Sequence, residues 1–223
     1  MKRILLTSLS LVVLAAAATQ ATAADLPRQM PVKAPAYVAP YYNWTGFYLG
    51  INGGYGFGNS SWSSPSSGSF NTNGGLIGGT AGYNWQLGQA VLGIEGDGDW
   101  NGISGTTNNN CPPGCKTSSN WLATVRGRLG YAVDRWMPYV TAGGAFGDIK
   151  ASIPGFSGMD TTKAGWTAGA GVEFAISGPW TAKLEYLYVD LGSANCGFSC
   201  GGFPPDNVSL KENIVRGGIN YRF

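Results

Sequence analysis

The stretch WTGFYLGINGGYGFG, residues 44–58, decides the fold, because its large apolar side chains recur at every second position. The residues on one face are Phe47, Leu49, Ile51, Gly53, Tyr55 and Phe57. The residues on the other face are Tyr48, Gly50, Asn52, Gly54 and Gly56. A period of two is typical of a β-strand with one apolar face. The stretch therefore predicts a strand whose apolar side faces a nonpolar environment.

The same alternation recurs in seven further segments of the chain. These segments are 74–87, 90–100, 120–133, 138–149, 162–176, 180–191 and 207–223. The connections between them alternate in length. Short connections are expected near 88–89, 134–137 and 177–179, and long polar ones at 59–73, 101–119, 150–161 and 192–206. An even number of strands joined by alternating short and long connections predicts an up-and-down antiparallel sheet with a short-turn end and a loop end.

Two closed architectures fit eight such strands: a transmembrane β-barrel and a soluble lipocalin-type barrel, in which the apolar side chains point inward. The spacing of the aromatic residues favours the first. Phe47 and Phe57 lie ten residues apart on the apolar face, which corresponds to about 25 Å of height in a tilted strand and matches a lipid-facing band. Trp121 and Tyr131 repeat this interval. We therefore predict an all-β fold, an eight-stranded antiparallel up-and-down transmembrane β-barrel.

The aromatic residues of the apolar faces fall into two belts, as expected at the two interfaces between lipid and water. The belt at the short-turn end comprises Phe47, Trp85, Tyr131, Trp136, Phe174, Trp180, Tyr221 and Phe223. The belt at the loop end comprises Tyr55, Phe57, Trp100, Trp121, Phe146, Trp166 and Tyr188.

Charged residues occupy the face opposite to the apolar one. An outward Arg or Lys at mid-bilayer would cost about 2–4 kcal/mol, so we expect these residues to point into the lumen. The predicted lumen charges are Glu95, Asp97, Asp99, Arg126, Arg128, Lys163, Glu173, Lys183, Glu185 and Arg216. The interior of an eight-stranded barrel is just wide enough to be filled by side chains. We therefore expect a plug of ion pairs, with a selectivity filter as the alternative.

The first 23 residues have the features of a secretory signal peptide. Lys2 and Arg3 precede an apolar run, and Ala21-Thr22-Ala23 supplies a cleavage site of the A-x-A type. The run is shorter than the ~20 apolar residues of a spanning helix. Residues 24–43 are rich in Pro and lack periodicity, which predicts a flexible leader that acts as a tether, with a peptidoglycan contact as the alternative. Residues 44–223 form the predicted barrel.

Composition excludes several classes of function. Without Lys2 and Arg3, 12 of the 14 basic residues remain against 12 acidic ones, so net charge gives no case for a nucleic-acid partner. The chain contains no His, which removes the Ser-His, metal-His and His-haem sites on which many enzymes rely. We expect no catalytic, metal or cofactor site, and no enzymatic activity.

Four cysteines lie in two of the long connections. Cys111 and Cys115 form one C-x3-C unit, and Cys196 and Cys200 form another. Cysteine pairs in a secreted chain indicate disulfides. We expect the two local pairings, because the two connections are not neighbours around an eight-stranded ring. A site of four thiolates for zinc is the alternative.

Eight stretches of the chain resemble the small outer-membrane β-barrel family of alphaproteobacteria, which includes rhizobial and Brucella-type outer-membrane immunogenic proteins and porin-family surface antigens. The stretches are YNWTGFYLGINGGYGFG (42–58), GGTAGYNWQ (78–86), VLGIEGDGDW (91–100), TVRGRLGYA (124–132), PYVTAGGAFG (138–147), GWTAGAGVEF (165–174), KLEYLYVDLG (183–192) and VRGGINYRF (215–223). The resemblance implies a protein of the Gram-negative outer membrane, in contact with its lipids and lipopolysaccharide.

The resemblance also implies roles. Phe223, together with Tyr221, would be the signal that the barrel-assembly machinery recognises at the end of the last strand. The protein would maintain envelope integrity and display its loops at the cell surface. A narrow porin for small solutes and an adhesin that contacts a host surface through the long loops are the alternatives.

Overall fold

The computed structural model of this 223-residue chain describes residues 42–63, 68–109, 114–155, 158–195 and 207–223. The predicted signal peptide and all but the last two residues of the predicted leader lie outside the described residues. Within the described part there is no helix that is long and apolar enough to cross a membrane, a finding that does not bear on strands.

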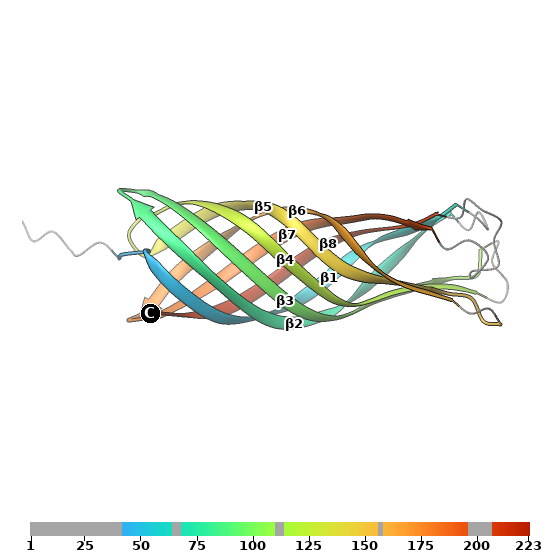
Figure 1. Ribbon diagram of the computed structural model, residues 1–223. Coiled ribbons are helices and arrows are strands. Elements are labelled where there is room, and N and C mark those ends of the chain that lie inside the picture. Colours follow the sequence, from blue (N-terminus) through green and yellow to red (C-terminus); the bar gives the residue numbers. More distant parts are fainter. Residues whose placement is uncertain (1–41, 64–67, 110–113, 156–157, 196–206) are drawn as a thin grey trace, which may run out of the picture. The chain divides into compact units, whose positions relative to one another are not determined.

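Eight antiparallel strands form one closed barrel in which each strand pairs with its neighbours in sequence and β1 pairs with β8 (Figure 1). The strands are β1 (Gly46–Trp62), β2 (Gly68–Leu87), β3 (Ala90–Thr107), β4 (Cys115–Tyr131), β5 (Trp136–Ser152), β6 (Met159–Ser177), β7 (Trp180–Asn195) and β8 (Asn207–Arg222). The predicted eight-stranded up-and-down topology is therefore confirmed.

The short connections turn tightly. Gly88 and Gly178 have φ values of 65° and 52° in the two-residue turns between β2 and β3 and between β6 and β7. Hairpins of this length require positive φ, which glycine adopts without steric cost. In the turn between β4 and β5, Asp134 has a φ of 52°, and Val133 and Trp136 form an isolated bridge. All three turns lie at the short-turn end.

The strands extend further toward the loop end than the sequence predicts. β1 reaches Trp62, β2 starts at Gly68 and β3 continues to Thr107, although most of these added residues were expected in polar loops. The physical reason is a change in polarity along the strand. Above the loop-end belt the outward residues are polar, such as Asn59 and Asn71, and the inward residues are apolar, such as Trp62. A search for outward apolar residues misses this reversed alternation.

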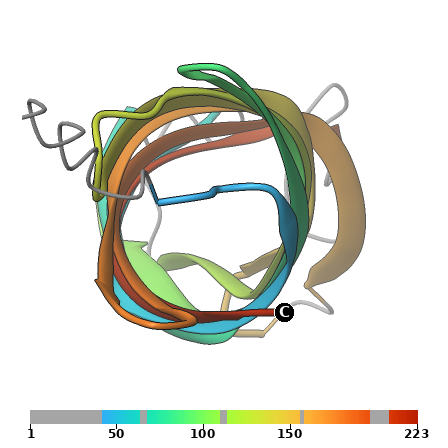
Figure 2. The ribbon, with the colours of Figure 1, turned by 90° about the vertical axis from the view of Figure 1, so that its left-hand side faces the viewer.

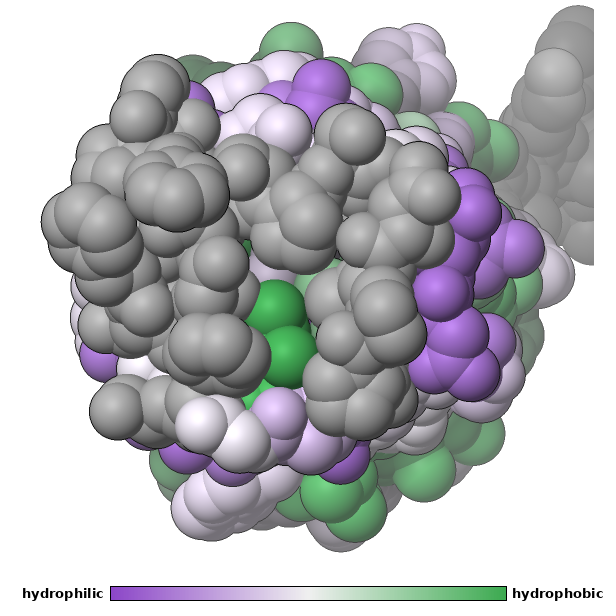
Figure 3. Space-filling view, turned by 90° about the vertical axis from the view of Figure 1, so that its right-hand side faces the viewer, coloured by the Kyte–Doolittle hydropathy of each residue, from purple (hydrophilic) through white to green (hydrophobic). Residues whose placement is uncertain are grey.

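A cluster of apolar side chains, here called the loop-end apolar cluster, fills the lumen at this end. Its buried members are Trp62, Leu76, Cys115, Leu122, Ala145, Ile149, Ala151, Ile153, Leu187, Val189, Leu191, Ala194, Val208, Leu210 and Ile214. Figure 3 views the barrel from the loop end, and apolar atoms are visible in its centre. The extended strands are thus held together by an ordinary hydrophobic core inside the barrel.

Both predicted aromatic belts lie on the outer surface of the barrel. At the short-turn end, Trp136 packs against Phe174 with ring centroids 4.5 Å apart, and Trp180 packs against Tyr221 at 5.1 Å. At the loop end, Trp166 packs against Tyr188 at 5.3 Å. Large aliphatic side chains between the belts are also exposed, which is the surface expected of a barrel in contact with lipid.

Candidate functional site: the charged lumen

Nine charged side chains meet in the lumen between the short-turn end and the loop-end apolar cluster. The members of this ion-pair network are Glu95, Asp97, Asp99, Arg126, Arg128, Glu173, Lys183, Glu185 and Arg216. They come from β3, β4, β6, β7 and β8, and each is buried. All nine belong to the set of lumen charges predicted from the alternation.

Arg126 of β4 is in the centre of the network. Its guanidinium contacts Glu95 at 2.6 Å, Asp97 at 2.5 Å and Glu185 at 3.1 Å. Glu95 and Asp97 lie on the adjacent strand β3, whereas Glu185 lies on β7 across the lumen. One side chain therefore links opposite walls of the barrel, and its hydrogen bonds are charge-assisted on both sides.

Arg216 of β8 connects the same carboxylates from a third direction. It contacts Asp97 at 2.9 Å, Asp99 at 2.8 Å and Glu185 at 2.8 Å. Lys183 adds a contact of 3.0 Å to Glu95. Because each charge of the network has an opposite charge within hydrogen-bond distance, the desolvation penalty of the network is offset by pairing.

Arg128 ties the network to the short-turn end. Its Nη2 donates to Glu173 Oε2, and its guanidinium lies 3.6 Å from the centroid of the Tyr139 ring. The Tyr48 hydroxyl donates to Glu95 Oε2 at 2.8 Å, and the Tyr139 hydroxyl donates to Glu185 Oε2 at 3.0 Å. These two lumen tyrosines were not among the predicted site residues, although both follow the inward alternation of their strands.

The residues just before β1, here called the capping segment (residues 42–45), cross the short-turn mouth of the barrel (Figure 2). Trp44 is completely buried there. Its backbone N–H donates to Gln86 Oε1 at 2.7 Å, and the Gln86 N–H donates to Thr45 Oγ1 at 3.0 Å. Burial raises the pKa of the Tyr42 hydroxyl, although the positive charge of Arg222 acts in the opposite direction. The capping segment thus covers the mouth below the ion-pair network.

Lys163 does not join the network. Its inward position follows from the alternation, but it pairs with Gly147 of β5 near the loop end, is only partly buried and belongs to no ion pair of the described residues. The expectation of a plug charge at this position fails because height along the strand, and not only the facing side, decides which charges can meet.

Two further buried acids were not predicted. Asp148 of β5 accepts backbone N–H bonds from Asn120 and Trp121 at 2.7 and 3.0 Å. Glu212 of β8 is buried among apolar neighbours toward the loop end. Glu212 could have been found, because Leu210, Ile214 and Arg216 share its inward alternation in the sequence.

The cysteine prediction lies mostly outside the described residues. Cys115 begins β4 and is completely buried. Cys111, Cys196 and Cys200 lie outside the described ranges, so the two local pairings stay a prediction. Within the described ranges, no three acidic or cysteine side chains are grouped so as to hold a metal ion.

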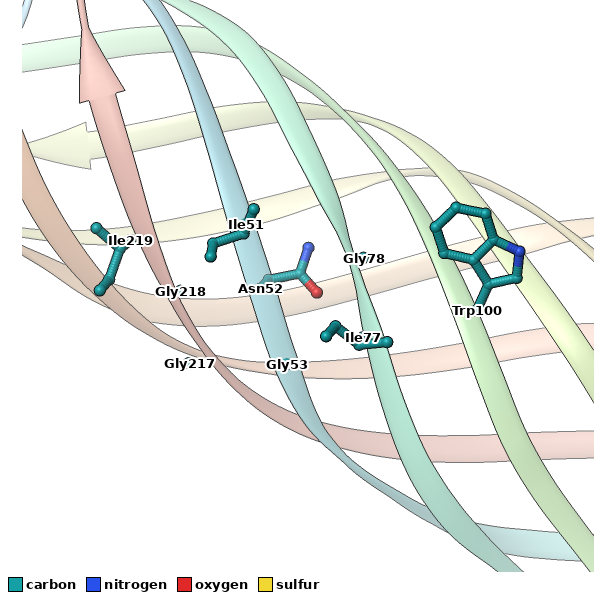
Figure 4. A pocket seen from close by; sticks show the side chains of 9 residues that line it. All are labelled: Ile51, Asn52, Gly53, Ile77, Gly78, Trp100, Gly217, Gly218 and Ile219. Carbon is teal, nitrogen blue, oxygen red and sulfur yellow. The ribbon is translucent and has the colours of Figure 1, made fainter.

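The outer wall carries a shallow apolar groove of 640 Å³ across β8, β1, β2 and β3 (Figure 4). Ile51, Ile77, Ile219 and Trp100 border it, and glycines including Gly53 and Gly217 form its floor. The groove reaches Trp100 of the loop-end belt and lies on the outer, lipid-facing surface of the barrel. Trp100 is 75% exposed, which fits a residue whose neighbour is lipid rather than protein.

Comparisons with known proteins agree with this geometry. A family model described as an outer membrane protein beta-barrel domain matches residues 8–223. The 31 kDa outer-membrane immunogenic protein of Brucella melitensis is 39% identical over 250 residues, with 100% of both chains covered. The 25 kDa outer-membrane immunogenic protein of Brucella canis is 34% identical over 219 residues, covering 96% of this chain and 98% of the relative.

Two further proteins are similar to this chain. The 22 kDa outer membrane protein of Rhizobium leguminosarum bv. viciae is 36% identical over 188 residues, covering 84% of this chain and 82% of the relative. Among solved structures, Neisserial surface protein A matches with a TM-score of 0.50 and 16% identity, covering 80% of this chain and 98% of the other. At that identity the match shows the fold alone.

Proposed function

The chain belongs to the outer membrane protein beta-barrel family and is located in the outer membrane, and on this premise we propose that it is a closed scaffold. In this role it stabilises the envelope and presents its loop end at the cell surface. The observation that carries the proposal is the ion-pair network, which joins opposite walls of the lumen through Arg126 and Arg216.

Three layers of side chains in the lumen support a closed scaffold rather than a porin. The loop-end apolar cluster occupies one end, the ion-pair network the middle, and the capping segment with Trp44 the other end. A narrow porin would need a continuous polar path. An eight-stranded barrel has little interior to spare for such a path once these side chains are in place.

The display of surface loops is supported by the relatives. Two of the similar Brucella proteins are named outer-membrane immunogenic proteins, a property that refers to those proteins. For this chain we propose that the connections at the loop end face the exterior, as the long loops of outer-membrane barrels do. The relatives are barrel proteins rather than enzymes, and we infer that this chain likewise has no catalytic role.

Conductance in planar lipid bilayers tests the closed-scaffold proposal. We expect refolded wild-type protein to show no stable single-channel steps. Arg126→Ala combined with Arg128→Ala removes two network cations and should produce measurable conductance. Arg135→Ala, in the exposed turn between β4 and β5, is the matched control and should remain silent. Regular steps from the wild-type protein would contradict the proposal and favour a narrow porin.

We also propose that the barrel-assembly machinery recognises the aromatic end of β8. The Phe223 N–H donates to the Phe47 carbonyl oxygen at 3.0 Å, and the Phe223 ring packs on Tyr221 and Phe47. Phe223→Ala should lower the amount of protein in the outer membrane, and Phe223→Tyr should preserve it, as quantified in isolated membranes. Equal amounts of wild type and Phe223→Ala would refute this role.

A further inference from the structure

Arg222 differs from the other buried cations of the lumen. It lies at the end of β8, it is 6% exposed, and neither Nη1 nor Nη2 has a hydrogen-bond partner. Within the described residues it belongs to no ion pair, whereas Arg126, Arg128, Lys183 and Arg216 each contact at least one carboxylate. A buried charge without a counter-charge is costly, so this guanidinium calls for a compensating group.

The carboxylate of the network that lies toward this end of the lumen is already engaged. Glu173 accepts hydrogen bonds from Arg128 Nη2, from Thr181 Oγ1 at 2.5 Å and from Asn220 Nδ2 at 3.1 Å. Its acceptor capacity is largely used by these three donors. Glu173 therefore does not supply the partner that the Nη atoms of Arg222 lack.

Other unpaired donors lie at the same end of the lumen. Trp44 is completely buried, and its Nε1–H has no acceptor. Asn84 of β2 is 1% exposed, and neither its Nδ2 nor its Oδ1 has a partner. The Asn84 Oδ1 lies against Gly93, where a Cβ would collide with it, which leaves Nδ2 on the side away from Gly93.

Strand register and packing bring these donors to one level. Arg222 pairs with Tyr48 of β1, and Asn84 pairs with Gly46 only two residues further down the same strand. Trp44 continues from β1, and its backbone is held by Gln86 of β2. Donors of β8, β2 and the capping segment therefore lie at nearly the same level, at the short-turn end of the lumen.

Aromatic rings lie close to the Arg222 guanidinium, but no acceptor lies within hydrogen-bond distance of its buried Nη groups. The guanidinium carbon lies 5.2 Å from the centroid of the Trp44 ring and 5.3 Å from that of Tyr42. Such stacking is favourable for a cation but satisfies none of its N–H donors. A planar guanidinium edge with two free Nη groups matches the oxygens of a carboxylate or a phosphate.

We propose that the short-turn end of the lumen binds a small oxyanion, a carboxylate or a phosphate group, between the Arg222 guanidinium edge, Trp44 Nε1 and Asn84 Nδ2. The anion supplies the negative charge that the described residues do not provide there. The capping segment covers the site. A pocket of 320 Å³ opens at this end of the barrel, and its lining includes Tyr42, Gln86 and Asp134 but none of the three donors.

Thermal unfolding of the full-length protein, refolded in detergent, tests the site. The midpoint is measured in sodium chloride while phosphate or acetate replaces chloride stepwise at constant ionic strength and constant pH. We expect a saturable rise of the wild-type midpoint, because a ligand that binds only the folded state stabilises it. A rise with phosphate alone identifies the phosphate group as the ligand, and a rise with acetate alone identifies the carboxylate.

Variants separate binding from general salt effects on stability. Arg222→Gln and Trp44→Phe should lose the saturable rise, the latter while keeping an aromatic ring at the mouth. Asn84→Asp places a carboxylate inside the site, so this variant should also lose the saturable rise. Its thermal midpoint in chloride should be equal to or higher than that of the wild type. Arg135→Gln, which removes an exposed arginine, should keep the full rise. No saturable rise in the wild type, or an unchanged rise in both Arg222→Gln and Asn84→Asp, overturns the proposal.

Discussion

At the scale of single residues, Arg126 forms ion pairs with three carboxylates rather than with one. It joins two carboxylates of β3 to one of β7, so its loss leaves three buried acids with fewer counter-charges. Breaking a buried pair by removing one partner is strongly destabilising, because the remaining charges stay buried and uncompensated.

We therefore expect Arg126→Met to lower the free energy of unfolding by about 3–5 kcal/mol, the range typical of broken buried ion pairs. Urea titration of the protein folded into lipid vesicles measures the change. Lys163→Met serves as the control, since Lys163 faces inward but lies outside the network, and it should change stability by less than about 0.5 kcal/mol. Similar losses for both variants would show that the network does not hold the walls together.

At the scale of the strand, two neighbouring glycines of β1 face opposite sides of the barrel and differ in how much space surrounds them. Gly53 faces the lipid at the floor of the outer groove, and a Cβ added there would meet only the Leu76 carbonyl oxygen, at 3.6 Å. Gly54 faces the lumen, where an added Cβ would collide with the Val215 carbonyl oxygen and lie 2.6 Å from the Arg216 Cβ. The close approach of β1 and β8 therefore depends on Gly54.

We expect Gly54→Ala to destabilise the barrel by about 1–3 kcal/mol, as overpacking of a dense interior does, and to weaken the seam between β1 and β8. Gly53→Ala should be neutral within about 0.5 kcal/mol. The fraction of protein that keeps its folded mobility in unheated gel samples, followed over temperature, reports both effects. Equal behaviour of the two variants would mean that the tight packing at Gly54 is not needed.

Much of the strand pattern could be predicted from the sequence, because a bilayer outside and a narrow lumen inside impose opposite polarity on alternate residues. The inward placement of Arg126 and Glu185 follows from this rule. Their contact does not, since it depends on strand tilt and register that bring together residues 59 positions apart. Lys163 illustrates the same limit. The alternation correctly predicts that Lys163 faces inward, but it does not give the position along the barrel axis, which keeps Lys163 out of the network.

The strand ends near the loops could not be predicted from the same rule, because the solvent changes there from lipid to water. Trp62 points inward to donate a hydrogen bond to Thr117 Oγ1 at 2.9 Å, whereas Phe57, five residues earlier, points outward. The capping segment was also missed, since its Pro-rich preceding sequence indicates only a tether. Its fold depends on the mouth of a barrel that exists only after closure.

At the scale of the whole molecule, the orientation of the tryptophans distinguishes a lipid-facing barrel from a soluble one. Trp166 and Trp100 lie on the outer surface, and Trp44 and Trp62 lie inside. A set of single-tryptophan variants, with the other seven of the 8 tryptophans replaced by Phe, isolates each position.

In vesicles that contain brominated lipids, we expect strong fluorescence quenching for the variants that retain Trp166 or Trp100, because bromine quenches on contact. The variants that retain Trp44 or Trp62 should be quenched weakly, since protein surrounds both rings. Quenching of all four to the same extent would contradict the inside and outside assignments on which the description of the barrel depends.

Above the loop-end belt the strands carry polar residues outside and apolar residues inside, so different substitutions are tolerated there than below it. Below the belt, outward residues contact lipid chains and must be apolar, and charged residues are tolerated only in the lumen. Above it, the same strands obey the rules of a small water-soluble domain, in which surface positions accept polar changes freely. The strand residues above the loop-end belt can therefore accept polar substitutions that the outward residues inside the bilayer cannot.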